Sequence, residues 1–276
     1  MMDKREQNVK IFEHTEKMCK TNNSLKEAVK NSLSKQELVL AEEDIQINIS
    51  EEKSARVIVS NKRTLEATEK YVKEGKRVCV LNFASATNPG GGVTRGSSAQ
   101  EEAICRCSTL FSCLNIKALW DKFYVPHRKA RNLLYNNDCI YTPEVVVIKR
   151  DSAFPELLPE EAWWKVDVIS CAAPNLRNNP NNKAVNISNK ELRELLRGRV
   201  GRIFELAIKN GVDVLILGAF GCGAFSNPPS VVAEIFSEFT EKYRKGFDVI
   251  EYAVYHTERE KANYDAFRGR MMRFTK

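Results

Sequence analysis

The sequence lacks the long apolar runs of a membrane protein. No stretch approaches the about 18 uncharged apolar residues that a membrane-spanning helix needs, which excludes such a helix. The first ten residues, MMDKREQNVK, are charged where a secretory signal would be apolar, so we expect a cytoplasmic protein without membrane contact. With only 13 glycines and 9 prolines among 276 residues, collagen-like and low-complexity chains are excluded as well. The hydrophobic share of 43% is enough to bury a core.

Patterns typical of metal sites are also scarce. There are only three histidines, far apart, and no two of the eight cysteines have the Cys-x-x-Cys spacing of many zinc sites. Cys105, Cys107 and Cys113 are close in sequence, but the two side chains of a Cys-x-Cys pair on a helix point in different directions and so are poorly placed to bind one metal ion. Several cysteines lie in apolar runs such as RVCVLNF, which indicates small buried side chains in a reducing compartment rather than disulfides. We therefore expect no metal and no cofactor.

Positive charge is only mildly in excess. The formal net charge is +7, from 43 Lys and Arg against 36 Asp and Glu, and nearly all of it belongs to residues 77–276. A diffuse excess of this kind is typical of a solvated surface, and it is compatible with an anionic small molecule or a phosphate-rich polymer. The chain has no arginine-rich tract and no basic run interleaved with aromatics, so sequence-specific nucleic-acid binding is not supported.

The N-terminal quarter of the chain is dense in charges and helix-forming residues. We expect two helices within residues 1–44, broken near residues 21–24, where Ser and Asn favour helix caps. IQINIS (45–50) and ARVIVS (55–60) are short strand candidates because β-branched residues cluster or alternate in them. TLEATEKYVKEG (64–75) begins with a capping threonine and ends with glycine, which predicts a helix.

After residue 76 the pattern changes to apolar runs that alternate with helical stretches. The predicted buried strands are 77–84, 144–150, 165–173, 212–220 and 248–255. The predicted helices are 99–116, 190–210 and 229–245. This alternation predicts an α/β fold of three layers, with a mainly parallel sheet covered on both faces. The Asn-rich stretch 175–188 is expected to be a long surface loop, and no linker is long enough to force a second domain.

A run of three glycines follows the first of these strands. Residues 88–92 read Asn-Pro-Gly-Gly-Gly, and a helix is predicted to begin soon afterwards with Gln100-Glu101-Glu102. Consecutive glycines cost backbone entropy and pack nothing, so they suit a place where backbone N–H groups closely approach a diphosphate or ribose. The loop follows the carboxyl end of a strand, where parallel sheets bind ligands. A tight surface turn is the alternative interpretation.

Glu101 and Glu102 also have two interpretations, one functional and one structural, because acidic residues often begin helices only to complement the helix dipole. Adjacent helical residues differ by about 100° in direction, so the two cannot face each other across one bond as in a retaining glycosidase. One can point at a substrate while the other hydrogen-bonds a neighbouring hydroxyl. A helix N-terminus lowers the pKa of a carboxyl, so a general acid here requires burial to raise it.

A second glycine-rich loop, GAFGCGAFSNPPS, follows the strand predicted at 212–220. Its glycines have the order G-x-x-G-x-G, which reverses the dinucleotide fingerprint, and no acidic residue closes a following strand about 20 residues further on, as NAD binding would require. Both features argue against a nicotinamide-dependent oxidoreductase, while the loop remains a suitable anion cradle. Phe225, just beyond it, is expected either to stack on a sugar or base or to plug the core.

The motif NPGGG, a short spacer, QEE and the GAFGCGAF loop together resemble the microbial poly(ADP-ribose) glycohydrolases of the macrodomain superfamily. The arrangement G-G-G-x7-Q-E-E, from Gly90 to Glu102, is the signature of that group. The similarity extends from about Ile58 to the C-terminus, where AAPN (172–175) and ANYDAFRGRM (262–271) are also typical of the family.

The resemblance implies a three-layer α/β/α macrodomain-like fold with a mixed, largely parallel central sheet. Residues 57–276 would form this catalytic domain, and residues 1–56 an N-terminal helical extension packed on it. The implied ligand is ADP-ribose or poly(ADP-ribose), with an ADP-ribosylated protein or nucleic acid as a further substrate class. We expect a monomer.

The resemblance also assigns roles to individual residues. Glu102 would be the catalytic residue, Glu101 would hold the ribose hydroxyls of the scissile unit, and Phe225 would pack against the terminal ribose. The diphosphate would be bound from one side by Gly90, Gly91, Gly92 and Val93, and from the other by Gly221, Cys222, Gly223 and Ala224. The other expected binding residues are Asn88, which supports the glycine turn, Gln100 and Gly218.

Elementary chemistry agrees with this assignment. Cleavage of a ribose O-glycosidic bond passes through an oxocarbenium-like state, and one glutamate can first protonate the leaving oxygen and then activate water. The diphosphate of the ligand could stabilise the positive charge on the ribose. A protein that binds ADP-ribose without turnover is the alternative, but it would not need the acid. The sequence leaves open whether the substrate is polymeric and whether cleavage is internal or terminal.

Overall fold

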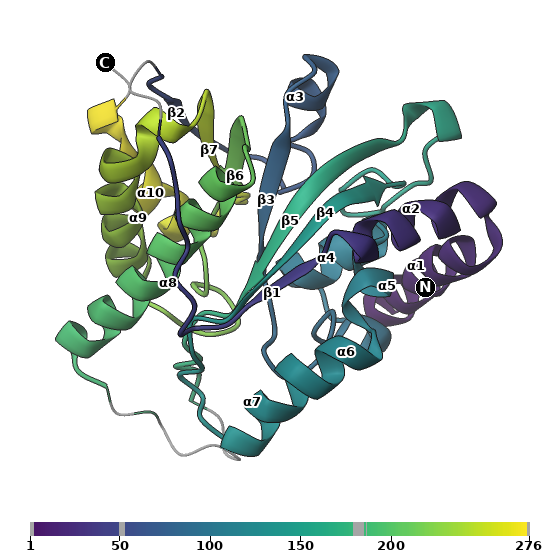
Figure 1. Ribbon diagram of the computed structural model, residues 1–276, viewed down its shortest axis with the longest axis horizontal. Coiled ribbons are helices and arrows are strands. Elements are labelled where there is room, and N and C mark those ends of the chain that lie inside the picture. The colour runs from purple at the N-terminus through teal and green to yellow at the C-terminus, as the bar shows by residue number, and fades with distance from the viewer. Residues whose placement is uncertain (1–2, 50–52, 179–184, 186, 275–276) are drawn as a thin grey trace.

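A seven-stranded sheet forms the centre of the computed structural model (Figure 1), which describes residues 3–49, 53–178, 185 and 187–274. The strand order is β1-β4-β5-β3-β6-β7-β2. The strands are β1 (Glu37–Val39), β2 (Arg56–Ser60), β3 (Val78–Phe83), β4 (Cys139–Val147), β5 (Trp164–Cys171), β6 (Val214–Leu217) and β7 (Val249–Ala253). Each of the five runs predicted after residue 76 overlaps one of these strands.

The sheet is mixed and largely parallel, as predicted. β3 pairs in parallel with β5 and β6, and β7 pairs in parallel with β6 and β2. β4 runs antiparallel to both β5 and β1, and its register shifts at a bulge between Thr142 and Val145. The parallel strands therefore end at one edge of the sheet, where loops from distant parts of the chain meet.

Helices cover both faces of the sheet, which confirms the three-layer α/β class (Figure 1). One face carries α8 (Asn189–Lys209), α9 (Pro229–Tyr243) and α10 (Ala262–Met271). The other carries α1 (Lys4–Thr21), α2 (Asn23–Ser34), α3 (Glu69–Lys73), α4 (Gln100–Cys107), α5 (Leu110–Leu114), α6 (Lys117–Leu119), η2 (Trp120–Tyr124) and α7 (Val125–Ala130). The short 3-10 turns are η1 (Val93–Arg95), η3 (Glu160–Ala162), η4 (Arg244–Gly246) and η5 (Met272–Phe274).

Two large apolar clusters form the core, one on each side of the sheet, and a third, small cluster contains Leu25, Val146 and Ile148. Phe204, Phe236 and Tyr252 belong to the cluster under α8 and α9. Phe12 and Leu110 belong to the cluster on the opposite face. Seven of the eight cysteines are buried and all eight are free thiols, in agreement with their apolar sequence context.

Three predicted elements differ from the structure. IQINIS is wrong as a strand, because residues 45–49 pair with no strand, and its last residue lies outside the described part. Ile45, Ile47 and Ile49 instead pack half-buried against the cluster under α8, where the chain crosses from β1 to β2. The helix expected over 64–75 is shortened to α3, after turns at 64–68, and the helix expected over 99–116 is split into α4 and α5 at Ser108.

The N-terminal segment contributes to the sheet as well as to the helical layer. β1 pairs with Cys139–Tyr141 of β4, so residues 37–39 form an edge strand that was not predicted. α2 contacts β4, and the Ser32 hydroxyl donates to the carbonyl oxygen of Glu144 at 3.2 Å. The division into residues 1–56 and 57–276 stays a prediction.

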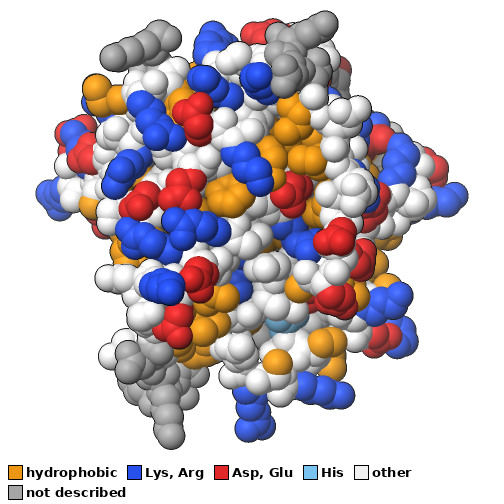
Figure 2. Space-filling view, turned by 60° about the vertical axis from the view of Figure 1, so that its left-hand side comes forward, with side chains coloured by type: hydrophobic (Ala, Val, Ile, Leu, Met, Phe, Trp, Pro, Cys, Tyr) orange, Lys and Arg blue, Asp and Glu red, His pale blue; other side chains and the backbone are white. Residues whose placement is uncertain are grey.

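The surface mixes charges of both signs. On the face drawn in Figure 2, Lys and Arg side chains are interspersed with Asp and Glu side chains and with small hydrophobic areas. Among the described helices, none is both long and apolar enough to cross a membrane.

Candidate active site

Two connected compartments lie at the carboxyl ends of the parallel strands. The first, here called the glutamate compartment, has a volume of about 610 Å³ and is lined by Glu101, Glu102 and Gly91, among others. The second, called the tyrosine compartment, has a volume of about 300 Å³ and is lined by residues that include Arg63 and Tyr255. Both are lined by Phe83, Ser98, Ala99, Ala224 and Phe225. The two predicted glycine loops therefore meet in one cleft.

The first glycine loop lies directly against the two carboxylates. Gly90 and Gly91 have positive φ values of 65° and 59°, a conformation that favours glycine. A Cβ on Gly91 would lie 2.7 Å from Glu102 Oε1 and 3.0 Å from Glu101 Oε2. Glycine is thus required here because the backbone and the carboxylates occupy adjacent space.

Glu102 has one oxygen bound and one oxygen without a partner. Its side chain is only 7% exposed, and Oε1 accepts a hydrogen bond from the Gly92 N–H at 2.9 Å. Oε2 is buried and has no hydrogen-bond partner among the described residues. Buried polar atoms are almost always paired, so this unpaired oxygen, on a side chain that lines the glutamate compartment, is exceptional.

Glu101 is held more completely and titrates abnormally. Its Oε2 accepts from the Ser85 N–H at 2.8 Å, and its Oε1 lies 3.4 Å from Asn82 Nδ2. Burial raises the pKa of Glu101 to about 8, with a further contribution from the charge of Glu102, while the Ser85 N–H lowers it. Glu101 therefore retains its proton at neutral pH, even though helix α4 begins there.

Gln100 fastens the start of α4 to strand β3. Its amide oxygen accepts from the Phe83 N–H at 2.8 Å, and its Nε2 donates to the Leu81 carbonyl at 2.7 Å and to Thr64 Oγ1 at 3.0 Å. These bonds fix the helix that presents both glutamates. A direct contact of Gln100 with substrate stays a prediction.

The N–H groups of the first glycine loop are already engaged within the chain. Gly91 donates to the Asn88 carbonyl at 3.0 Å, Gly92 donates to Glu102, and Val93 donates to the Gly90 carbonyl at 3.1 Å. The loop therefore supports the carboxylates, and its contact with a diphosphate stays a prediction. The Asn88 amide also accepts from Arg128, whose Nε donates to the Thr87 carbonyl.

The second glycine loop presents free N–H groups instead. Gly218 passes close to strand β7, because a Cβ there would lie 2.9 Å from the Ala253 carbonyl oxygen, and Gly221 has a φ of 72°. The Cys222 N–H closes a turn onto Ala219. A Cβ on Gly223 would meet nothing within 4 Å, and the N–H groups of Gly223 and Ala224 make no hydrogen bond to any described residue.

Phe225 lies where the two compartments meet. It is half-buried, packs partly against the core cluster under α8, and its ring centroid is 6.2 Å from that of Tyr135. The remaining surface of the ring lines both compartments. Its contact with the terminal ribose stays a prediction.

Sequence reasoning missed the residues of the tyrosine compartment. Tyr255 is 51% exposed, which is unusual for so large an aromatic side chain, and the Arg63 guanidinium lies 4.4 Å from its ring centroid. Both residues follow strands, β7 and β2, at the same edge of the sheet as the glycine loops. The rule that located those loops could therefore have found this pair too.

Sequence reasoning also missed the brace that α1 forms beneath the glutamate compartment. Asn8 Nδ2 donates to the Gly96 carbonyl at 3.0 Å, and Thr15 Oγ1 donates to the Arg106 carbonyl at 2.6 Å. Gly96 approaches the helix so closely that a Cβ would lie 2.2 Å from the Arg5 carbonyl oxygen. Helix α1 thus fixes the spacer between the glycines and the glutamates.

No group of three or more His, Cys, Asp or Glu side chains within the described residues is placed to hold a metal ion. Cys105, Cys107 and Cys113 are buried, and burial raises the pKa of each thiol.

Comparison with known proteins places this site in a family. A search of curated proteins finds no match. The solved structure of poly(ADP-ribose) glycohydrolase (PARG) from Thermomonospora curvata is 30% identical, with a TM-score of 0.83, and the match covers 96% of this chain and 99% of that one. The PARG from Deinococcus radiodurans in complex with ADP-ribose is 28% identical, with a TM-score of 0.75, covering 90% of this chain and 98% of that one.

A structure of the Thermomonospora curvata enzyme bound to the inhibitor ADP-HPD also matches, at 30% identity and a TM-score of 0.80, covering 95% of this chain and 98% of that one. A family model described as the catalytic domain of microbial-type PARG matches residues 5–150, which include α1, α2, the glycine run and both glutamates. The chain belongs to the microbial-type poly(ADP-ribose) glycohydrolase family.

Proposed function

We propose that this protein is a poly(ADP-ribose) glycohydrolase in which Glu102 is the general acid and base. The observation that carries the assignment of Glu102 is its Oε2, which is buried, has no partner among the described residues and belongs to a side chain lining the glutamate compartment. A general acid must be within hydrogen-bond reach of the leaving oxygen, and an unpaired carboxylate oxygen on a side chain that lines the cleft is the group best suited to that role.

The reaction then follows from this geometry. Glu102 donates its proton to the glycosidic oxygen while the bond from ribose C1″ to that oxygen breaks, which leaves an oxocarbenium-like ribose. The diphosphate of the bound unit stabilises the positive charge. Glu102, now a carboxylate, takes a proton from water as the water oxygen bonds to C1″. The products are ADP-ribose and a chain that is one unit shorter.

The raised pKa of Glu101 keeps a proton in the active site, and the reaction cycle needs that proton. Because burial raises that pKa to about 8, Glu101 holds a proton at neutral pH. A pair that shared no proton could not begin with acid catalysis. Glu101 itself, fixed by Ser85, is positioned to hold ribose hydroxyls.

The cleft accommodates the rest of ADP-ribose along its length. We place the terminal ribose in the glutamate compartment with Phe225 beside it, and the diphosphate at the free N–H groups of Gly223 and Ala224. The adenosine then lies in the tyrosine compartment, where Tyr255 offers an aromatic face.

The test is an incubation of the purified protein with poly(ADP-ribose), and separately with NAD, followed by chromatographic separation of the products. Release of free ADP-ribose from the polymer is the expected result. Unchanged polymer together with measurable ADP-ribose binding would instead identify a binding module, and NADH formation with an added alcohol would identify an oxidoreductase.

We further propose a macrodomain-like catalytic domain over residues 57–276 that acts as a monomer, with residues 1–56 as its extension. Free thiols at all eight cysteines suit a reducing compartment, which supports a cytoplasmic location.

A further inference from the structure

Arg106 is a buried cation on helix α4 that has no carboxylate partner. The residue is only 5% exposed, and it forms no ion pair within the part of the chain that the structure describes. Its Nε is buried and makes no hydrogen bond to a described residue. A buried charge is costly to a fold when no opposite charge neutralises it. An apolar side chain would pack α4 at a lower cost, so the guanidinium is expected to have a further role.

The hydrogen bond that the Arg106 side chain does make reaches the spacer, the residues 93–99 that connect the glycine run to α4. Its Nη1 donates to the Ser97 carbonyl at 2.5 Å. Asn8 holds the same segment from helix α1, because its Nδ2 donates to the Gly96 carbonyl at 3.0 Å. Two adjacent carbonyl groups of the spacer are thus fixed by side chains from two different helices.

The spacer is linked to the carboxylate of Glu102 through Gly92. The Ser97 N–H donates to the Gly92 carbonyl at 3.2 Å, and the Gly92 N–H donates to Glu102 Oε1 at 2.9 Å. The contact between Ser97 and Gly92 is close, since a Cβ on Gly92 would lie 2.3 Å from Ser97 Oγ. The Gly92 N–H is the one group among the described residues that donates to this carboxylate, so the position of Gly92 decides where the carboxylate points.

These bonds return to the helix on which they begin. Glu102 and Arg106 are four residues apart on α4 and therefore lie on the same side of it, one turn from each other. Burial lowers the pKa of the Arg106 guanidinium, while the charges of Cys107 and Glu102 act in the opposite sense. The path from Arg106 through Ser97 and Gly92 to Glu102 thus forms a closed ring, which fixes the carboxylate relative to its own helix.

We infer that Arg106 is a positioning residue for Glu102, which it holds in place through the spacer. The inference rests on the proposed function, because the orientation of Glu102 matters for turnover only if Glu102 is the acid and base. Arg106 lines neither compartment of the cleft, so it acts without touching the substrate. Its effect on the rate is nevertheless large, since displacement of a catalytic group by about 1 Å can cost about 10²-fold.

The first test is the steady-state kinetics of Arg106→Met on poly(ADP-ribose). Methionine fills the space of the arginine stem but cannot donate to the Ser97 carbonyl. We expect kcat to fall by about 10- to 10²-fold while KM stays within about twofold, because the side chains that line the cleft are unchanged. Arg106→Lys keeps the charge and a donor group, and it should recover most of the lost kcat.

The second test needs no turnover, because it follows the N–H group that binds Glu102. Hydrogen exchange of the Gly92 amide is measured by NMR in the substrate-free protein. In Arg106→Met this amide should exchange several-fold faster than in the wild type, since its hydrogen bond to Glu102 is no longer held in place. In Arg106→Lys the exchange should be close to that of the wild type.

Asn8→Ala is a second variant that leaves Arg106 intact. It releases the Gly96 carbonyl from helix α1, so it should also lower kcat at an unchanged KM and speed the exchange of the Gly92 amide. Because this change lies on another helix, it tests the role of the spacer even if Arg106→Met fails to fold.

Arg202→Gln is the matched control. Arg202 on α8 also donates to backbone carbonyls, those of Ala41 and Glu43, at 2.7 and 2.8 Å, but these lie outside the spacer. Its substitution removes the same kind of bond and should leave kcat, KM and the exchange of the Gly92 amide at their wild-type values.

The outcomes separate this inference from the proposed function. Wild-type kcat in folded Arg106→Met, or a lowered kcat with unchanged Gly92 exchange, would overturn the inference. A loss of kcat no greater than that of Arg202→Gln would mean that Arg106 serves stability alone. If the wild-type protein releases no ADP-ribose from the polymer, the proposed function has failed, whereas the exchange of the Gly92 amide still decides whether Arg106 positions Glu102.

Discussion

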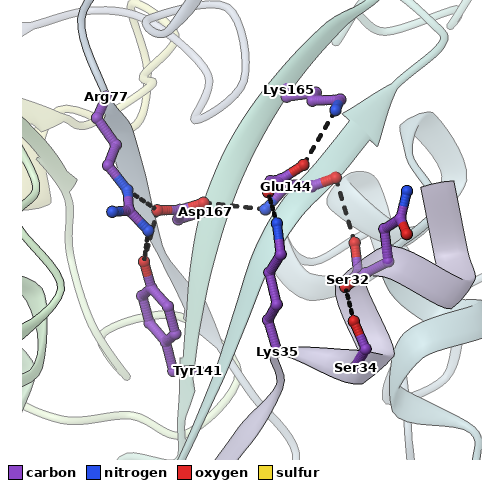
Figure 3. A network of polar contacts seen from close by, with 9 residues as sticks. Ser32, Ser34, Lys35, Arg77, Tyr141, Glu144, Lys165 and Asp167 are labelled. Carbon is purple, nitrogen blue, oxygen red and sulfur yellow. Dashed lines mark hydrogen bonds and ion pairs between the residues drawn. The ribbon is translucent and has the colours of Figure 1, made fainter.

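Buried carboxylates occupy both ends of the sheet, and they differ in how completely they are bound. Near the amino end of β3, Asp167 accepts from Arg77 Nε at 2.7 Å, from the Tyr141 hydroxyl and from the Glu144 N–H at 2.9 Å (Figure 3). Both of its oxygens are used. At the carboxyl end, Glu102 uses one oxygen, and the other has no partner among the described residues.

Glu144 extends the fully bound network toward the N-terminal helices. It has a φ of 56° at the bulge in β4, and its side chain reaches Lys165 at 3.0 Å and Lys35 (Figure 3). These two lysines lower the pKa of Glu144. This end also has a cavity, of about 730 Å³, yet its carboxylates are neutralised.

The comparison teaches that partners, rather than burial or the presence of a cavity, distinguish a structural carboxylate from a reactive one. A carboxylate whose oxygens are all bound to cations and N–H groups stabilises the fold and has nothing left to offer a substrate. A buried carboxylate with a free oxygen and a protonated neighbour is costly to the fold and is suited to proton transfer.

The largest expected effect is on turnover in Glu102→Gln. The amide is isosteric but cannot donate and recover a proton, so kcat on poly(ADP-ribose) should fall by about 10²–10⁴-fold. The affinity for ADP-ribose, measured by calorimetry, should stay within about an order of magnitude of the wild type. Turnover close to that of the wild type would remove Glu102 from the mechanism.

The next effect concerns the second glycine loop. Gly223→Val places a branched side chain in the open space beside the free N–H groups, where the diphosphate is proposed to lie. Because no described residue lies within 4 Å of that Cβ, the fold should tolerate the change while ADP-ribose affinity falls about 10²-fold. Unchanged affinity in a folded variant would make this loop merely a turn.

Phe225→Ala separates the two interpretations of that ring. If Phe225 orients the terminal ribose, kcat should fall by up to about 10²-fold with a small loss of melting temperature. A ring that serves only the core would instead cost about 3–5 kcal/mol of stability and leave the activity of each folded molecule unchanged. Both quantities are measured on the same preparation.

The smallest effect is a pH dependence of stability that arises from Glu101. Its pKa is raised from 4.5 to about 8 in the folded state, so the folded protein binds this proton more tightly than the unfolded chain does. The stabilisation is fully present below pH 4.5 and is lost as the pH rises through about 8. Glu101→Gln, followed by urea denaturation across this window, should gain stability relative to the wild type as the pH rises. A constant difference would mean that Glu101 titrates normally.

Much of the fold could be predicted because the parallel strands are continuous Val, Ile and Leu runs, and the cleft lies where they end. The stretch at 45–49 shows the limit of this reasoning. Its isoleucines alternate as in a strand, but alternation cannot show whether a partner strand is present. The helices at 117–130 were missed for a related reason, because their start depends on packing against the second core cluster.

The sequence predicted which residues meet in the cleft, but not which glycine loop supports the carboxylates. Both glycine loops were expected to bind the diphosphate, and this stays a prediction for each. The first loop also supports the carboxylates, and the second has N–H groups, at Gly223 and Ala224, that make no hydrogen bond to a described residue. Either role requires glycine, so the sequence could not distinguish them. The brace from Asn8 to Gly96 joins residues 88 positions apart, and no local pattern records such a contact.

The most direct test of the account is the free energy of unfolding of Glu102→Gln measured beside that of Asp167→Asn by urea denaturation. Glu102→Gln keeps an oxygen for the Gly92 N–H, so its stability should equal that of the wild type within about 0.5 kcal/mol. Asp167→Asn turns an NH₂ group toward donors, so it should lose about 1–3 kcal/mol while keeping wild-type turnover. Equal destabilisation of the two variants would contradict the claim that one carboxylate is reserved for chemistry and the other for the fold.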